Sequence, residues 1–148
     1  MDVILVPGLW LDGSSWDAVT PALDAAGHRT HPLTLPGMAA TDTDRAGVSL
    51  RDQVDAVVAA IDACAEPVVL IGHSAGCGIA YAAVDARPDR VARAIYVGGF
   101  PTGDGDHLAD GFPARNGEVP LPDWSAFGAE DLTDLDEPAR DEFRARAV

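Results

Sequence analysis

Lysine is absent from this sequence, cysteine is scarce, and no long hydrophobic run occurs. The ten basic residues are all arginines and stand against 24 acidic residues, which gives a formal net charge of −14. Nucleic-acid binding needs basic patches that neutralise phosphates, so this charge argues against a nucleic-acid partner. A membrane helix needs about 18 or more apolar residues in a row, so we expect no membrane span.

The two cysteines, Cys64 and Cys77, lack the spacing of a metal-binding motif, and the sequence implies no metal and no cofactor. We expect both to be reduced thiols in a cytoplasmic protein. A catalytic role for Cys77 is disfavoured because no base is placed for it. The N-terminal residues Met1 to Gly8 lack a basic region and lead directly into a predicted strand, so no signal peptide is expected.

Apolar runs and helical spacings alternate over the first hundred residues of the 148-residue chain. The predicted strands are Val3–Val6, His28–Leu35, Pro67–Ile71 and Val91–Val97. The predicted helices begin at Ser14, Ser49 and Ser74 and end near Ala26, Ile61 and Arg87. This alternation predicts an α/β fold, in which helices flank a parallel sheet and the crossovers are right-handed. The last predicted strand should lie at one edge of that sheet.

The sequence pattern changes after Phe100: residues 101–148 contain no strand-like run and carry scattered acidic and apolar residues. We therefore predict a core over residues 1–100 and an incomplete, helical cap or lid over residues 101–148. A mobile acidic tail is the alternative for the second segment.

The stretch VVLIGHSAGCG, from Val68 to Gly78, places Ser74 between Gly72 and Gly76 in a G-x-S-x-G pattern. A buried strand before the serine and a helix after it are typical of a nucleophile held on a sharp turn. The N–H of Ala75 and the N–H of Leu9, in the loop after the first strand, are the candidate donors of an oxyanion hole. The alternative is a structural serine that caps the helix, which does not explain the two glycines.

These residues resemble the α/β-hydrolase superfamily, and within it the small plant-type methylesterase and hydroxynitrile-lyase branch. The matching stretches are VPGLWLDGSSW, VTPALDAAGHRTHPLTLPG, VVLIGHSAGCG and AIYVGGFPTGDG, which cover residue 1 to about residue 106. The first loop of that branch usually reads His-Gly, whereas this chain has Pro7-Gly8. The change keeps a backbone donor but removes any contribution of a histidine to the pocket.

The resemblance implies a catalytic acid after a later strand and a histidine after the last strand, and this chain ends before both. We favour none of the four histidines as the base, namely His28, His31, His73 and His107. We also disfavour Asp104 and Asp106, which follow the fourth predicted strand, as the catalytic acid. We therefore expect a partial hydrolase fold that lacks the last strands, in a chain truncated within its cap. An exposed edge strand would then need a second fragment or a second copy to cover it.

The favoured function is an esterase-like serine hydrolase that attacks a small ester or related acyl substrate through Ser74. The chain alone is expected to be inactive or very weak, because loss of one member of a catalytic triad leaves only a small residual rate. Two alternatives stay open, a lyase on the same scaffold and a binding module without chemistry. The sequence does not name the substrate or the oligomeric state.

Overall fold

The computed structural model describes residues 1–42, 44–100, 103, 112–115 and 118–148. Its four strands are β1 (Asp2–Val6), β2 (Arg29–Pro32), β3 (Val68–His73) and β4 (Val91–Val97). They form one parallel sheet in the order β2-β1-β3-β4. The predicted parallel α/β architecture is thereby confirmed, and β4 lies at a sheet edge as expected.

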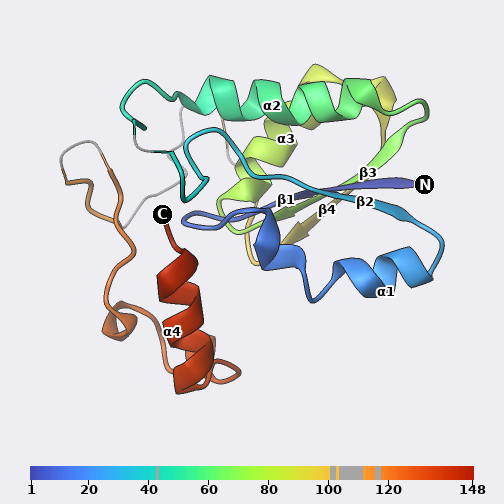
Figure 1. The fold of residues 1–148 in the computed structure, drawn as a ribbon. Coiled ribbons are helices and arrows are strands. Elements are labelled where there is room, and N and C mark those ends of the chain that lie inside the picture. Colours follow the sequence, from blue (N-terminus) through green and yellow to red (C-terminus); the bar gives the residue numbers. More distant parts are fainter. Residues whose placement is uncertain (43, 101–102, 104–111, 116–117) are drawn as a thin grey trace.

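Helices lie on both faces of the sheet (Figure 1). α2 (Leu50–Ala63) and α3 (Gly76–Ala86) cover one face, while α1 (Thr20–Ala25) and the short 3-10 helix Gly13–Trp16 lie on the other. α2 begins where the sequence predicts, because the Ser49 hydroxyl accepts from the N–H of Asp52 and the Asp52 carboxylate accepts from the N–H of Ser49.

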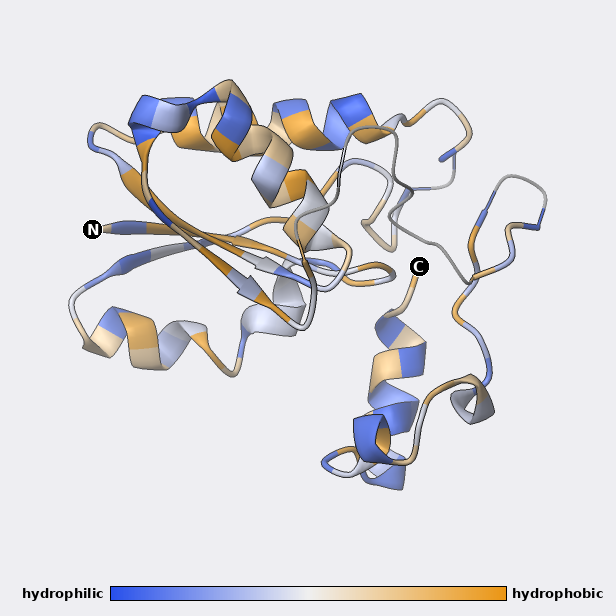
Figure 2. Ribbon diagram, turned by 180° about the vertical axis from the view of Figure 1, so that it is seen from behind, coloured by the Kyte–Doolittle hydropathy of each residue, from blue (hydrophilic) through white to orange (hydrophobic). Residues whose placement is uncertain are grey.

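The core divides into two layers because successive residues of a strand point to opposite faces. Ile4 and Val6 of β1 pack with Val68 and Leu70 of β3 against α2 and α3. Val3 and Leu5 pack with Trp16 on the other face. Figure 2 shows hydrophobic residues concentrated along the strands, whereas α4 (Glu137–Arg146) is mostly hydrophilic.

The helix predicted from Ser14 to Ala26 is wrong as a single element. A 3-10 helix capped by Asp12 covers Gly13–Trp16, and α1 starts only at Thr20 with Pro21 in its first turn. Proline lacks an N–H group and its ring clashes with the carbonyl four residues earlier, so one helix cannot run through Pro21. Similarly, β2 ends at Pro32 rather than at Leu35, and α3 begins at Gly76 rather than at Ser74.

The described residues beyond β4 form the 3-10 helices Trp124–Ala126 and Glu130–Leu132, followed by α4. This segment contacts the loop after β1 through Trp10, whose indole Nε1–H donates to the carbonyl of Val119 at 2.7 Å. The Trp10 ring also packs edge-on against Phe112 and Phe127, with ring centroids 5.0 and 6.4 Å away. Within the described part of the chain, no helix combines the length and apolar character needed to cross a bilayer.

Candidate active site

Ser74 occupies the turn between the carboxyl end of β3 and the first residue of α3, and its side chain is exposed. Its φ of +51° lies in the left-handed region, which non-glycine residues adopt at a cost of about 1–3 kcal/mol. Its N–H donates to the carbonyl of Val97 at 2.9 Å, which ties the turn to the end of β4. A strained, exposed serine between a strand and a helix matches the geometry of a nucleophile elbow.

The two glycines of the G-x-S-x-G pattern are required by close backbone contacts. A Cβ added at Gly76 would lie 2.2 Å from the carbonyl oxygen of Pro7, and one added at Gly72 would lie 2.8 Å from the carbonyl oxygen of Gly76. The start of α3 is thus pressed against both β3 and the loop that follows β1. No larger residue fits at either position without a backbone shift.

The predicted oxyanion residues lie beside this turn. A Cβ added at Gly8 would lie 3.0 Å from the Cβ of Ser74, so the loop that carries Leu9 passes directly against the serine. Ala75 immediately precedes α3, whose N-terminal N–H groups favour negative charge. The loop is itself strained, because Trp10 has a φ of +66°. The roles of Ser74, Leu9 and Ala75 in catalysis stay predictions.

A cavity of about 600 Å³ opens next to the turn, between the α1 side of the sheet and α4. Its walls include Trp16, His73, Val97, Leu135 and Phe143. Ser74 is not among the described residues that line it, so the cavity lies beside Ser74 rather than around it. The volume is within the range of small-molecule sites.

His73 faces this cavity from the residue before Ser74. Its ring packs edge-on against Trp16, with centroids 6.3 Å apart, and burial lowers the pKa of the imidazole. A histidine with a lowered pKa is held neutral near neutral pH, as a packing residue of this wall.

We expect His73 to make the fold sensitive to mild acid. The unfolded chain binds a proton at a pKa near 6.5, whereas folded His73 does so only at lower pH, so stability is complete above about pH 6.5 and falls below it. Urea unfolding of the wild type and of His73→Asn at several pH values between 5 and 8 measures this slope. A wild-type slope that His73→Asn leaves unchanged would contradict the assignment, because the slope would then arise from another titrating group.

Of the three other histidines, two lie away from Ser74 and one lies outside the described residues. His28 precedes β2 and His31 lies within it, and β1 separates β2 from β3, whose carboxyl end carries Ser74. His31 contacts Asp2, with Nε2 and Oδ1 2.6 Å apart. His107, Asp104 and Asp106 lie outside the described residues.

Comparison with known proteins places this arrangement in a family. A sequence model described as the alpha/beta hydrolase family matches residues 3–148. The chain belongs to the alpha/beta hydrolase family. Esterase PIR7B of Oryza sativa subsp. japonica is 39% identical over 111 residues, and the pyrethroid hydrolase of Sphingobium wenxiniae is 35% identical over 105 residues.

The chain spans only part of these hydrolases, namely 41% of the rice esterase and 38% of the pyrethroid hydrolase, while the matches cover 71% and 70% of this chain. The crystal structure of a pyrethroid hydrolase from Sphingobium faniae superposes with a TM-score of 0.63 at 30% identity, over 67% of this chain and 40% of that one. An extracellular alpha/beta-hydrolase from a Paenibacillus species, described as homologous to tobacco salicylic acid binding protein 2, gives a TM-score of 0.67 at 26% identity. That match covers 96% of this chain and 52% of the other. These relatives confirm the predicted resemblance to small esterases of the family.

Proposed function

We propose that this chain carries the nucleophile and the oxyanion donors of a serine hydrolase that acts on small esters. The observation that carries the proposal is the exposed, left-handed Ser74 at the turn between β3 and α3. One relative is named an esterase and another a pyrethroid hydrolase, and the esterase supports a small ester as the substrate class.

The proposed reaction starts with attack of the Ser74 Oγ on the acyl carbon of the ester. The new O–C bond pushes the carbonyl electrons onto oxygen, and the N–H groups of Leu9 and Ala75 stabilise that negative charge. The serine proton passes to a base, which then delivers it to the departing alkoxide. Water cleaves the acyl-serine by the same steps, and the carboxylic acid leaves.

The base and its acid are proposed to come from outside this chain. Among the described residues, His73 packs on Trp16, and His28 and His31 lie before and within β2, which β1 separates from β3. Without a base the chain alone should turn over esters very slowly. A stable 148-residue monomer with full esterase activity would contradict this part of the proposal.

A fluorophosphonate probe tests the nucleophile directly, because it forms a covalent adduct with activated serines. We expect slow labelling in buffer, faster labelling when imidazole is added as an external base, and an adduct that maps to the peptide containing Ser74. A positioned general base typically contributes about 10²- to 10⁴-fold, so free imidazole should recover part of that factor. Intact mass and peptide mapping provide the measurement.

An adduct on another residue, or none even with imidazole, would remove the nucleophile role. Ligand binding without any adduct would instead favour a binding module without chemistry. The observation in its favour is that His73 packs on Trp16, while His28 and His31 lie on the far side of β1 from Ser74.

The proposal also includes a cytoplasmic setting, which the two free thiols support. It further includes a second segment or a second copy that covers the edge strand β4, where Ile95 and Val97 are 38% and 45% exposed.

A further inference from the structure

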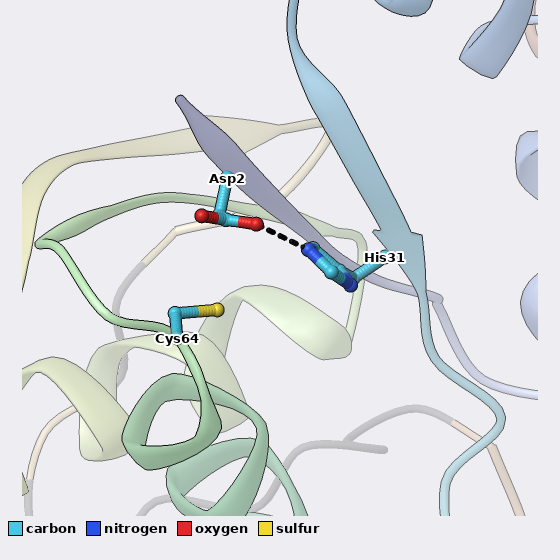
Figure 3. Close-up of side chains that lie close together, drawn as sticks. All are labelled: Asp2, His31 and Cys64. Atoms are coloured by element: carbon cyan, nitrogen blue, oxygen red, sulfur yellow. Dashed lines mark hydrogen bonds and ion pairs between the residues drawn. The ribbon is translucent and has the colours of Figure 1, made fainter.

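Three residues with metal-binding side chains meet at the amino-terminal end of the sheet, opposite to the end that carries Ser74. Asp2 opens β1, His31 lies in β2, and Cys64 directly follows α2 as its C-cap (Figure 3). One oxygen of Asp2, one ring nitrogen of His31 and the Cys64 sulfur all lie within 4.8 Å of one another. The proposed hydrolase chemistry uses none of them.

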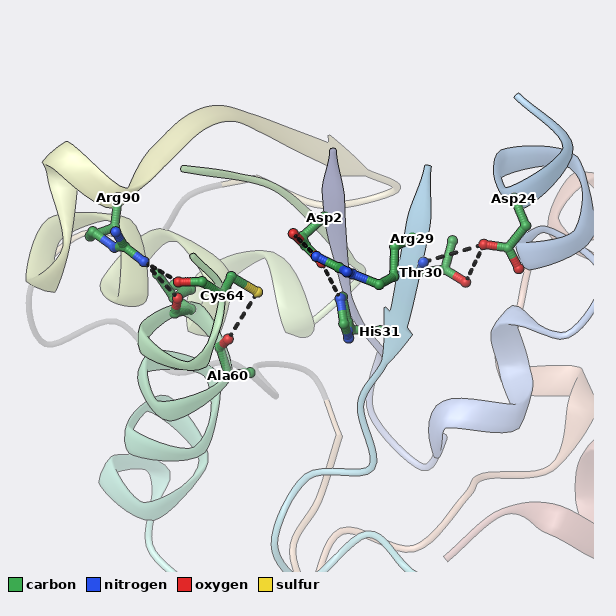
Figure 4. A network of polar contacts seen from close by, with 9 residues as sticks. Asp2, Asp24, Arg29, Thr30, His31, Ala60, Cys64 and Arg90 are labelled. Carbon is green, nitrogen blue, oxygen red and sulfur yellow. Dashed lines mark hydrogen bonds and ion pairs between the residues drawn. The ribbon is translucent and has the colours of Figure 1, made fainter. Parts of the chain in front are cut away.

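The carboxylate of Asp2 is a preformed anionic ligand. Asp2 is only 6% exposed, and its carboxylate accepts two hydrogen bonds from Arg29 and contacts Nε2 of His31. Figure 4 shows the surrounding polar contacts, among them a hydrogen bond from Arg90 to the carbonyl of Cys64 that fixes the end of α2. Two of the three ligand candidates are therefore held in place by other side chains.

Arg29 contacts both oxygens of this carboxylate, and His31 also contacts Oδ1 through its Nε2. The Nε of Arg29 lies 2.5 Å from Oδ1 of Asp2 and its Nη2 lies 2.7 Å from Oδ2. The Arg29 side chain is 71% exposed, so it can withdraw from Oδ1 into solvent at little cost. A carboxylate offers about four lone-pair sites, so Oδ2 can keep its arginine contact while Oδ1 binds another partner.

We propose that Asp2, His31 and Cys64 form a binding site for one divalent cation of the zinc class. A thiolate, an imidazole and a carboxylate are a zinc donor set, whereas magnesium and calcium prefer oxygen alone. Zinc–ligand distances are about 2.0–2.3 Å, so three ligand atoms already this close need only small side-chain movements. Three protein ligands leave a fourth position for water.

Binding requires the Cys64 thiol to lose its proton. The thiol now donates to the carbonyl of Ala60, with Sγ and the oxygen 3.4 Å apart. The cation must therefore displace a proton, which predicts affinity that increases with pH.

Cobalt(II) titration of the tag-free chain, followed by absorption, tests the proposal. We expect one cobalt per chain with a thiolate-to-cobalt charge-transfer band, displaced by zinc. Cys64→Ser should abolish the band, His31→Gln should weaken binding by about 10- to 100-fold or more, and Arg29→Gln should tighten it a few-fold. Cys77→Ala is the matched thiol control and should keep the band.

Alkylation of the wild type supplies a readout that does not depend on how the variants fold. Zinc should slow the reaction of iodoacetamide with Cys64 and leave Cys77 unaffected. A wild-type chain without the charge-transfer band and without zinc protection of Cys64 would overturn the site, as would a band that persists in folded Cys64→Ser. Serine labelling by the fluorophosphonate is independent of either result.

Discussion

Substitution of Gly76 by alanine is expected to destabilise the fold severely, although it adds a single methyl group. That methyl would lie 2.2 Å from the carbonyl oxygen of Pro7 and 2.9 Å from that of Val6, both of them backbone atoms. Overpacking that side chains can absorb costs about 1–3 kcal/mol, and here the backbone of β1 or α3 must move instead. The expected loss exceeds about 3 kcal/mol, a large part of the roughly 5–15 kcal/mol of a typical domain.

Gly47→Ala is the matched control, because a Cβ at Gly47 meets nothing within 4 Å. It should leave stability unchanged or raise it by up to about 1 kcal/mol, since alanine reduces the freedom of the unfolded chain. Urea unfolding followed by circular dichroism measures both variants. Equal stabilities for Gly76→Ala and Gly47→Ala would contradict the close packing of α3 on the first loop.

Substitutions of Ser74 are expected to separate chemistry from stability. Ser74→Ala and Ser74→Gly should both abolish fluorophosphonate capture in the presence of imidazole, because the attacking oxygen is gone. Ser74→Gly should also be more stable than Ser74→Ala by roughly 1 kcal/mol, because glycine accepts a φ of +51° without the penalty of a Cβ. Intact mass and urea unfolding of the two variants give the two readouts.

Ser15 provides the control for this comparison. It is an exposed serine of the 3-10 helix Gly13–Trp16 and is not among the described residues with positive φ. At Ser15 the order should reverse, with the alanine variant more stable than the glycine variant. Labelling that survives in Ser74→Ala would show that Ser74 is not the nucleophile. The same order of stability at both serines would show that the backbone of Ser74 is not strained.

Local patterns predicted the elements around Ser74 well. The apolar run before it, the two glycines and the small residues after it are all close in sequence, so one turn could be inferred from eleven letters. The break at Pro21 was also present in the sequence, but the apolar spacing of Trp16, Val19 and Leu23 favoured one continuous helix. There the missing N–H and the ring of Pro21 outweigh the periodicity.

The cluster of Asp2, His31 and Cys64 could not be predicted, because no sequence spacing links its members. Its assembly depends on the register that sets Ile4 of β1 opposite His31 of β2, and on where α2 ends. Such pairings follow from the tertiary arrangement of the whole sheet. Two cysteines without a zinc-like spacing suggested no metal ligand, while the fold brings one of them next to a histidine and a buried carboxylate.

The packing of Trp10 makes tryptophan fluorescence sensitive to the contacts of the loop after β1. The chain has three tryptophans, and the indole of Trp10 is bonded to Val119 and enclosed by Phe112 and Phe127. Indole emission depends on the polarity around the ring, so separation of this segment from the loop would shift the emission of Trp10 to longer wavelength. The residue next to a proposed oxyanion donor therefore reports, without any added dye, whether the segment beyond β4 is docked on the core.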